Sequence, residues 1–215
     1  MKVVKDGIFF TVQGEGPFIG YPMIFVRFSG CNLKCEWCDT KYSWEDGEEM
    51  SVADVVEEIR EFPCKRVCFT GGEPLLQQQD IVKIIENFGI DYDFHFETNG
   101  TIEPVNYLSN LGFHIISPKL QFSYNVAPYY RNESLGYFKF VITGEDDLLD
   151  VLKFIEYNNL QNRGNKFYLM PESITVEKQQ DILPKLICFA KSHTELNFIV
   201  TPRLHILAYG NKRGV

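Results

Sequence analysis

The stretch RFSGCNLKCEWCDT, residues 27–40, carries Cys31, Cys35 and Cys38 in the spacing Cys-x3-Cys-x2-Cys. Three thiolates this close together can ligate three irons of a [4Fe–4S] cubane, and they leave the fourth iron without a protein ligand. An electron carrier with four cysteines caps every iron, whereas a site with three leaves one iron free to bind a reacting molecule. The spacing therefore predicts an iron–sulfur centre that takes part in chemistry.

Two other ligand chemistries fit three neighbouring cysteines. With a histidine they could hold structural zinc, but no second pair of ligands follows the loop at the spacing of a zinc finger. The apolar segment MIFVRF before the loop and the aromatic Trp37 within it also disfavour zinc without excluding it. A disulfide framework is the weakest alternative, because a chain of 215 residues without a secretory signal does not need cross-links.

The remaining cysteines are expected to ligate nothing. Cys64 and Cys68 also show an x3 spacing, but the segment KRVCFT is typical of a buried strand, in which a free cysteine behaves as a small hydrophobe. Cys188 lies in the apolar pattern LICFA of a late helix, which predicts a core position.

The size and charge of the chain narrow its class. With 215 residues, 45% of them hydrophobic, it can bury a full core, and its length fits one domain over residues 1–215. The formal net charge of −8 disfavours a nucleic-acid partner, which needs a basic surface. No apolar run approaches the roughly 20 residues that span a bilayer, and the first residues do not resemble a signal peptide. We therefore expect a cytoplasmic protein that binds neither nucleic acid nor a membrane.

Apolar, β-branched runs alternate with helical patterns along the chain. Ser51 is expected to cap the clearest helix, SVADVVEEIREF, with Asp54 three residues later, and Pro63 ends it. The expected strands are Met23–Phe28, Arg66–Thr70, Phe94–Thr98, His114–Ser117, Tyr137–Ile142, Lys166–Met170 and Phe198–Thr201. The other expected helices are Gln78–Phe88, Asp146–Asn158 and Val176–Ser192.

This alternation predicts an α/β fold with a mostly parallel sheet. Because a complete eight-unit barrel takes about 250 residues, we expect an abbreviated, open barrel, a partial TIM-type fold. Ligands of such sheets bind at the carboxyl ends of the strands, where the motifs of this chain should converge. The segment Leu120–Leu135 is the longest irregular stretch and is a candidate lid or dimer contact.

A second motif, Thr70-Gly71-Gly72-Glu73-Pro74, follows the expected strand RVCF. Paired glycines let the backbone approach a ligand that a Cβ would exclude, although glycine and proline are also ordinary turn residues. In this order and about 30 residues apart, the two motifs resemble those of the radical S-adenosylmethionine (SAM) enzymes. The resemblance implies a [4Fe–4S] cluster whose open iron chelates SAM.

Residues at other strand ends fit a SAM pocket. Ser117 and Lys119 flank a proline and could bind the ribose and carboxylate of SAM, or simply end a strand in solvent. Met170-Pro171 lies where the family often has Gln-Pro near the adenine, and Glu97 could be a structural carboxylate. Together with the resemblance, this predicts the following SAM-binding residues: Trp37, Cys38, Asp39, Gly72, Glu73, Ser117, Pro118, Lys119, Met170, Pro171, Glu172 and Ser173.

The ends of the chain are more specific than its centre. FFTVQGEGPFIGYP (residues 9–22) and TPRLHILAYGNKRGV (residues 201–215), with the cysteine loop, resemble the 7-carboxy-7-deazaguanine synthase family over nearly the whole chain. That resemblance implies a lyase that converts 6-carboxy-5,6,7,8-tetrahydropterin to 7-carboxy-7-deazaguanine with loss of ammonia, on the route to queuosine and related deazapurines. It also implies a homodimer and an electron donor such as flavodoxin.

The substrate carries a carboxylate and a pterin edge, and several residues offer suitable groups. Arg27 has a planar fork for a carboxylate, or could be a strand-end ion-pair residue, and His205 could face the site or be structural. The expected substrate-binding residues are Val12, Gln13, Gly14, Glu15, Arg27, Thr70, His205 and Val215, the last through its terminal carboxylate. The resemblance makes Thr40 the protein ligand of a magnesium ion, whereas the residue pattern alone favours a capping role.

By the same resemblance, one electron from the cluster cleaves SAM, a hydrogen is taken from the pterin and later returned, and SAM is regenerated. No protein side chain is then a catalytic acid or base, and the protein orients the substrate and excludes water. Two alternatives remain open at this point. One is an activase of a glycyl-radical enzyme, which shares the cysteine loop, and the other is a non-enzymatic zinc or iron–sulfur module.

Overall fold

The computed structural model describes residues 1–122, 124–132, 136–161 and 164–214. Their centre is a sheet in the order β3-β1-β2-β4-β5-β6-β7-β8-β9. The strands are β1 Lys2–Val12, β2 Pro22–Phe28, β3 Glu48–Glu49, β4 Arg66–Gly71, β5 Asp93–Thr98, β6 Phe113–Ile116, β7 Tyr137–Ile142, β8 Lys166–Pro171 and β9 Ile199–Val200. The helices are α1 Val52–Arg60, α2 Gln78–Ile85, α3 Asn106–Ser109, α4 Pro128–Asn132, α5 Glu145–Tyr157, α6 Val176–Ser192 and α7 Leu204–Tyr209. Short 3₁₀ turns are η1 Gly16–Phe18, η2 Lys41–Ser43, η3 Pro74–Gln77 and η4 Thr194–Leu196.

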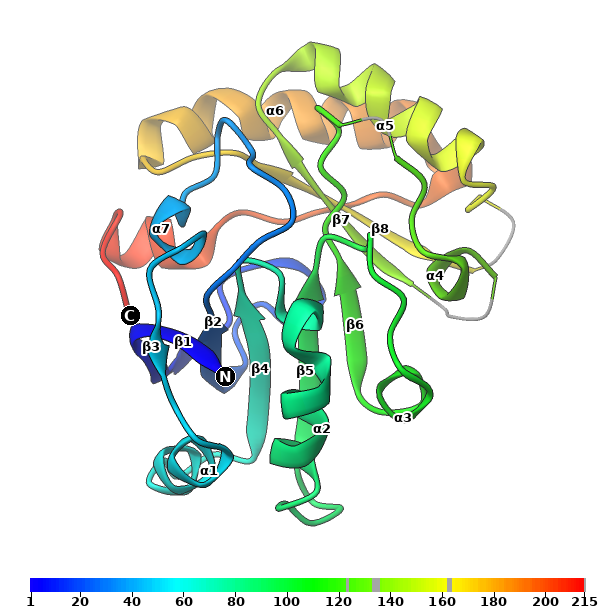
Figure 1. Ribbon diagram of the computed structural model, residues 1–215. Helices are drawn as coiled ribbons and strands as arrows, with labels where there is room; N and C mark the ends of the chain where they lie inside the picture. The colour runs from blue at the N-terminus through cyan, green and yellow to red at the C-terminus, as the bar shows by residue number, and fades with distance from the viewer. Residues whose placement is uncertain (123, 133–135, 162–163, 215) are drawn as a thin grey trace.

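Neighbouring strands are parallel along the order β2-β4-β5-β6-β7-β8-β9. Strand β1 pairs antiparallel with β2 on one side and with β3 on the other. In the strand order β3 and β9 are the two ends, so the curved sheet is an open, partial TIM-type barrel, as the sequence predicts. The helices α1, α2, α5 and α6 lie outside it (Figure 1). Within the described ranges, no helix is long and apolar enough to cross a bilayer.

Strand β1 was not expected from the sequence. It begins at Lys2, and its pairing register with β2 shifts between Val3 and Ile8. Asp6 in this interval has φ +54°, and a Cβ on Gly7 would lie 2.5 Å from the Val4 carbonyl oxygen. A bulge of this kind breaks the strict alternation by which a strand is recognised.

Successive side chains of a strand point to opposite faces of the sheet, so the buried apolar residues form two layers. On β2, Ile24, Val26 and Phe28 belong to the large core under the helices. Met23 and Phe25 point to the concave side. The concave layer is closed at the amino ends of the strands by Phe18, whose ring lies 4.4 Å from that of His95, 4.9 Å from that of Phe113 and 5.9 Å from that of Tyr137, between centroids. Functional groups therefore have room only at the carboxyl ends.

The expected helices are present with small shifts at their ends. Ser51 accepts the Asp54 N–H, and Asp54 accepts the Ser51 N–H, which completes the predicted capping box of α1. The expected core position of Cys188 is wrong, because its side chain is exposed on α6. The helical phase explains this, since Ile182 and Leu186 take the buried stripe of α6.

Two other expectations about unligated or irregular residues can be compared with the structure. Cys68 is fully buried in β4, whereas Cys64 precedes that strand and is half-buried. The segment Leu120–Leu135 contains α4, whose Tyr130 is buried in the core with its hydroxyl 3.0 Å from His114 Nδ1. This part of the segment is held in the fold, and residues 123 and 133–135 lie outside the described ranges.

The chain after β9 returns to the N-terminal loop across the open side of the sheet. There the Leu204 N–H donates to the Gly14 carbonyl oxygen at 2.9 Å. A Cβ on Gly14 would lie 2.1 Å from His205 Nδ1, so the loop and α7 pack without a gap. We call this contact between residues 13–16 and 203–205 the seam. The marked ends of the chain lie on the same side of the molecule (Figure 1).

Candidate active site

A cavity of about 310 Å³ lies at the carboxyl ends of the parallel strands. Most of the residues singled out from the sequence line it: Val12, Gln13, Gly14, Glu15, Arg27, Cys31, Cys35, Trp37, Cys38, Asp39, Thr40, Thr70, Gly72, Ser117, Lys119, Met170, Glu172 and His205. The fold thus gathers residues that are up to 193 positions apart (12 to 205) around one space. Glu73, Pro118, Pro171 and Ser173 are not among the lining residues, and Val215 lies outside the described ranges.

The three cysteines occupy the loop between β2 and η2. The Cys31 sulfur accepts the Leu33 N–H at 3.4 Å, and the Cys38 N–H donates to the Cys35 carbonyl oxygen at 3.2 Å. Burial raises the pKa of the Cys31 thiol and raises that of Cys35 to about 11, and the neighbouring cysteines add to both shifts. All three side chains face the cavity, as ligands of a shared group would.

The turn Thr70-Gly71-Gly72-Glu73-Pro74 holds the cysteine loop through backbone hydrogen bonds. The Gly72 N–H donates to the Phe28 carbonyl oxygen at 3.1 Å, and the Glu73 N–H donates to that of Gly30 at 2.8 Å. A Cβ on Gly72 would lie 2.0 Å from the Gly30 oxygen and 3.0 Å from Cys31 Cβ. Only glycine permits this approach of the two loops.

Glu73 was expected to bind SAM, but its side chain is fully buried behind the cavity. Its carboxylate accepts the Asn99 N–H at 2.7 Å, the Thr98 hydroxyl at 2.9 Å and the Leu75 N–H at 3.1 Å. Burial raises its pKa, and these hydrogen bonds oppose that rise. The carboxylate therefore joins the end of β4 to the end of β5, and only the backbone of the turn is left to meet a ligand.

The loop after β5 supports the cysteine loop from the other side. The Asn99 amide donates to Asn32 Oδ1 at 2.9 Å, and the Asn32 amide donates to Thr101 Oγ1 at 2.8 Å. Tyr124 donates its hydroxyl to the Asn99 carbonyl oxygen at 2.8 Å. Asn99 and Thr101 belong to the segment FETNGT, residues 96–101. This segment therefore supports the cysteine loop by hydrogen bonds to Asn32, which lies between Cys31 and Cys35.

The donor set fits a cluster better than a single ion. Within the described ranges no three His, Cys, Asp or Glu side chains form a group that could hold one metal ion. Tetrahedral zinc needs all its sulfurs about 2.3 Å from one point. The three thiolates of a [4Fe–4S] cluster bind different irons, so they can lie farther apart around one space. Three cysteines facing a single cavity, on a loop held from both sides, match the second arrangement.

The expected SAM residues from the later strands divide into two groups. Lys119 Nζ donates to Ser117 Oγ at 2.7 Å and lies 5.4 Å from the centre of the Trp37 ring, so these three form one wall of the cavity. Burial lowers the pKa of Lys119. By contrast, the Ser173 side chain is fully buried and bonds within its own turn to Thr175. Met170 near the end of β8 and Glu172 after that strand line the cavity.

Thr40 does not cap the loop through its hydroxyl. Its carbonyl oxygen accepts the Ser43 N–H at 2.8 Å and the Ser43 hydroxyl at 2.7 Å, which completes the turn. The Thr40 hydroxyl instead lies 3.6 Å from the Cys38 sulfur, at the edge of the cavity. The expected capping role of the Thr40 side chain is therefore not observed, and a ligand in the cavity can reach its hydroxyl.

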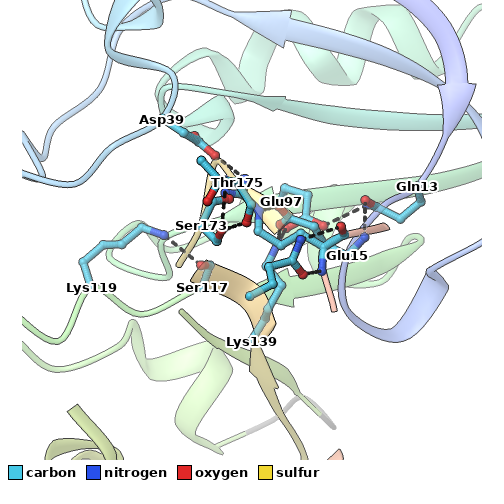
Figure 2. A network of polar contacts seen from close by, with 11 residues as sticks. Gln13, Glu15, Asp39, Glu97, Ser117, Lys119, Lys139, Ser173 and Thr175 are labelled. Atoms are coloured by element: carbon cyan, nitrogen blue, oxygen red, sulfur yellow. Dashed lines mark hydrogen bonds and ion pairs between the residues drawn. The ribbon is translucent and has the colours of Figure 1, made fainter. Parts of the chain in front are cut away.

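A ring of hydrogen bonds forms the floor beneath the N-terminal loop (Figure 2). Lys139 Nζ donates to Glu15 Oε2 at 2.7 Å and to Glu97 Oε2 at 2.8 Å. The Gln13 amide donates to Glu97 Oε1 at 3.1 Å, and its oxygen accepts the Glu15 N–H at 3.2 Å. We call Gln13, Glu15, Glu97 and Lys139 the floor ring.

Arg203 extends the floor ring to the cysteine loop. Its Nε donates to Glu15 Oε1 at 2.9 Å, its Nη1 donates to the Ser173 carbonyl oxygen at 2.7 Å, and its Nη2 pairs with Asp39. The Gln179 side chain in turn bonds both backbone groups of Arg203, at 2.8 and 3.2 Å. One buried cation thus joins the N-terminal loop, the start of α7 and the residue after Cys38.

Neighbouring charges set the pKa values of the buried ionisable groups in the floor ring and of Asp39. Burial alone would raise the pKa of Glu15, but Lys139, Arg203 and His205 hold it well below its ordinary value. Burial would likewise raise the pKa of Asp39, and Arg203 lowers it. Burial would lower the pKa of Lys139, and the two glutamates raise it. Glu15, Asp39 and Lys139 are therefore charged at neutral pH, as the Arg203 guanidinium always is.

Two further expected residues line the cavity with their side chains available. The Arg27 guanidinium lies 5.8 Å above the Phe9 ring, and among the described residues it forms no ion pair. His205 packs on Gly14, and burial lowers the pKa of its imidazole. At neutral pH it is therefore an uncharged group that can donate and accept one hydrogen bond each.

The C-terminal segment covers one side of the cavity. Asn211, Lys212, Arg213 and Gly214 line it, and the Arg213 guanidinium lies 3.8 Å from the centre of the Tyr42 ring. This cation–π contact joins the segment to the turn that follows the cysteine loop.

Several residues of the site were not found from the sequence, among them Lys139, Arg203 and the Asn32–Asn99 pair. One signal was available for Lys139, since a charged residue in the apolar strand YFKFVI must have a partner to be buried. Arg203 and Asn32 lay inside segments already quoted but had no local pattern of their own. Their partners are 188 residues away (Glu15) and 67 residues away (Asn99), respectively.

The chain is similar in sequence to a large enzyme superfamily and to named members of one family. The family model of the radical SAM superfamily matches residues 25–156. The chain is 35% identical to a 7-carboxy-7-deazaguanine synthase of Pyrobaculum aerophilum, over 96% of this chain and 95% of the relative. It is 32% identical to a protein of the same description from Thermoplasma acidophilum, over 97% of this chain and 98% of the relative.

Solved structures share the fold at lower identity. QueE from Escherichia coli superposes with a TM-score of 0.73 at 22% identity, covering 95% of both chains. Streptococcus suis SuiB, solved with its precursor peptide SuiA, gives a TM-score of 0.59 at 17% identity over 83% of this chain and 48% of SuiB. At these identities the likeness concerns the fold alone.

Proposed function

Because this chain belongs to the radical SAM superfamily and, within it, to the 7-carboxy-7-deazaguanine synthases, we propose that its cavity converts 6-carboxy-5,6,7,8-tetrahydropterin to 7-carboxy-7-deazaguanine with loss of ammonia. Its relatives identify the chain as an enzyme of this type, and the family implies a [4Fe–4S] cluster and SAM. One observation carries the substrate assignment. The cysteine loop, the loop Val12–Glu15 and the C-terminal segment all line the same cavity.

The cofactors have a wall of their own in this proposal. Cys31, Cys35 and Cys38 hold the cluster, and the Gly72 backbone lies directly against that loop. When bound, the cluster and SAM supply the radical chemistry. The wall of Trp37, Ser117 and Lys119 is the place for the polar end of SAM, since it offers a cation, a hydroxyl and an aromatic face.

The opposite wall suits the substrate. Arg27, which forms no ion pair among the described residues, binds the substrate carboxylate through its planar fork. Glu15 and His205 offer acceptors to the amino and ring N–H groups of the pterin edge. Buried walls keep water from the reacting atoms, which is the protein's share of the chemistry.

Thr40 is proposed as the protein ligand of a magnesium ion that also binds the substrate carboxylate. Its hydroxyl is not used by the turn and lies at the edge of the cavity next to Cys38. Magnesium keeps several waters and accepts few protein oxygens, so one hydroxyl with substrate oxygens is a reasonable ligand set. We further propose that residues 1–215 act as one domain, that two copies form a homodimer in the cytoplasm, and that a flavodoxin-type protein donates the electron.

The decisive experiment is anaerobic reconstitution with iron, sulfide, SAM, Mg²⁺ and the carboxylated pterin. The proposal predicts a new deazapurine absorbance and release of ammonia, with more product formed than SAM supplied. Cys31→Ala should abolish both the cluster and the product, whereas the matched variant Cys68→Ala should keep the cluster, because Cys68 is fully buried and does not line the cavity. Release of one 5′-deoxyadenosine per turnover, without deazapurine, would overturn the assignment and favour an activase.

A further inference from the structure

Lys139 is a buried cation in the middle of an apolar strand. It lies on β7, its side chain is 6% exposed, and its neighbours Phe138 and Phe140 point into the core. An ammonium group removed from water is costly unless charged partners surround it. Lys139 has two such partners, Glu15 and Glu97, whose side chains are 17% and 11% exposed.

The contacts of Lys139 all lead to the N-terminal loop. Its ammonium holds Glu15 directly, and through Glu97 it holds the Gln13 amide. Its aliphatic stem lies under Gly16, where a Cβ would be 3.2 Å from Lys139 Cδ. The Gln13 oxygen accepts the Glu15 N–H and so closes the floor ring. The loop therefore has its conformation set from below by one side chain (Figure 2).

We propose that Lys139 is a positioning residue for substrate, which acts by pairing with Glu15 and Glu97 together, so that the Glu15 carboxylate stays in place under the pterin. The inference rests on the proposed function. Lys139 does not itself have to touch the substrate. It neutralises one of the two carboxylates, and Arg203 serves Glu15 from the other side.

Removal of the charge of Lys139 leaves the two glutamates without the cation that they share. Glu15 keeps Arg203, but Glu97 keeps only the neutral Gln13 amide. Two carboxylates that shared one ammonium then repel each other in a water-poor site. The repulsion displaces Glu15 from its place under the pterin, and a neutral side chain at position 97 removes the repulsion.

The test is the dissociation constant of the carboxylated pterin, measured by anaerobic calorimetry on the reconstituted enzyme with SAM. Lys139→Met should weaken binding by about 10- to 100-fold. The double variant Lys139→Met/Glu97→Gln should regain most of the affinity, because the introduced amide is neutral and no longer repels Glu15. SAM affinity should be the same in all forms.

The outcomes separate this inference from the proposed function. Wild-type affinity in Lys139→Met, or a loss that is not rescued by Glu97→Gln, would overturn the positioning role and leave the enzyme assignment intact. A wild-type protein that binds SAM but not the pterin would overturn both. If Lys139→Met does not fold, Lys139→Gln keeps an N–H donor without the charge, and the same loss of affinity and the same rescue by Glu97→Gln are expected.

Discussion

Replacing His95 with phenylalanine should make the folded protein less sensitive to mild acid. His95 is 1% exposed on the concave side of β5, between the rings of Phe18 and Phe113 at 4.4 and 5.0 Å. Neither ring nitrogen has a hydrogen-bond partner among the described residues. Burial lowers its pKa to about 4, with Asp93 opposing and Arg66 adding to the shift. The imidazole is therefore held neutral in the folded state.

The sign and size of the effect follow from proton linkage. The unfolded chain binds a proton at this histidine near pH 6.5, and the folded chain only near pH 4, so acid favours the unfolded state. The stability is complete above about pH 6.5 and is lost as the pH falls toward 4. Between about pH 7.5 and pH 5.5 the loss is about 1.3 kcal/mol, which for a chain of this size corresponds to about 3–5 °C in Tm.

The assay is thermal unfolding of the reconstituted protein under anaerobic conditions at these two pH values. The fall in Tm on acidification should be smaller by about 3–5 °C in His95→Phe than in wild type. His95→Leu, which keeps the apolar volume but not the ring, should show the same reduced fall. Equal falls in wild type and both variants would mean that His95 takes up its proton in the folded state, and the argument from burial would be refuted.

Three further changes test the walls of the cavity. Gly72→Ala should prevent cluster assembly, measured as iron content and visible absorbance, because its Cβ would lie 2.0 Å from the Gly30 oxygen, and normal cluster content would contradict the close approach. Glu73→Gln should destabilise the protein by about 1–3 kcal/mol in chemical unfolding, because an amide N–H₂ replaces one of the acceptors of three hydrogen bonds; an unchanged midpoint would refute this. Thr40→Ala should lower product formation and its response to Mg²⁺, while Thr40→Ser should preserve both, and identical Mg²⁺ titrations of the two would exclude the hydroxyl as a ligand.

The parallel part of the fold could be predicted from the sequence because each element carries its own signal. Apolar runs marked the strands β2 and β4 to β9, and the capping box of Ser51 and Asp54 marked α1. The longest missed strand, β1, has a bulge at Asp6 and pairs antiparallel with β2, so its residues do not show the pattern of the others. Cys188 was misplaced because an apolar stretch on a helix does not tell which residues fall outside the buried stripe.

The site was predictable where a motif is local and not where charges pair over long distances. Cys31, Gly72 and Glu15 were found because each belongs to a short motif. Lys139 and Arg203 were not, since their partners come from other strands and loops, and only the fold brings them together. Glu73 was assigned to SAM because its motif resembles that of the radical SAM enzymes, but its side chain is buried and accepts hydrogen bonds from the end of β5 and the residue after it.

The seam has a consequence for how the molecule opens. It is held by the hydrogen bond from Leu204 to Gly14 and by the ion pair of Arg203 with Glu15, whereas β7 and β8 are paired over six registered residues. Local opening follows the weakest set of contacts, so the amide hydrogen of Leu204 should exchange with solvent long before those of the central strands. Such an opening separates α7 and the N-terminal loop without breaking a strand pair. The side of the barrel that lacks a strand ladder is therefore the one that can admit ligands while the sheet stays intact.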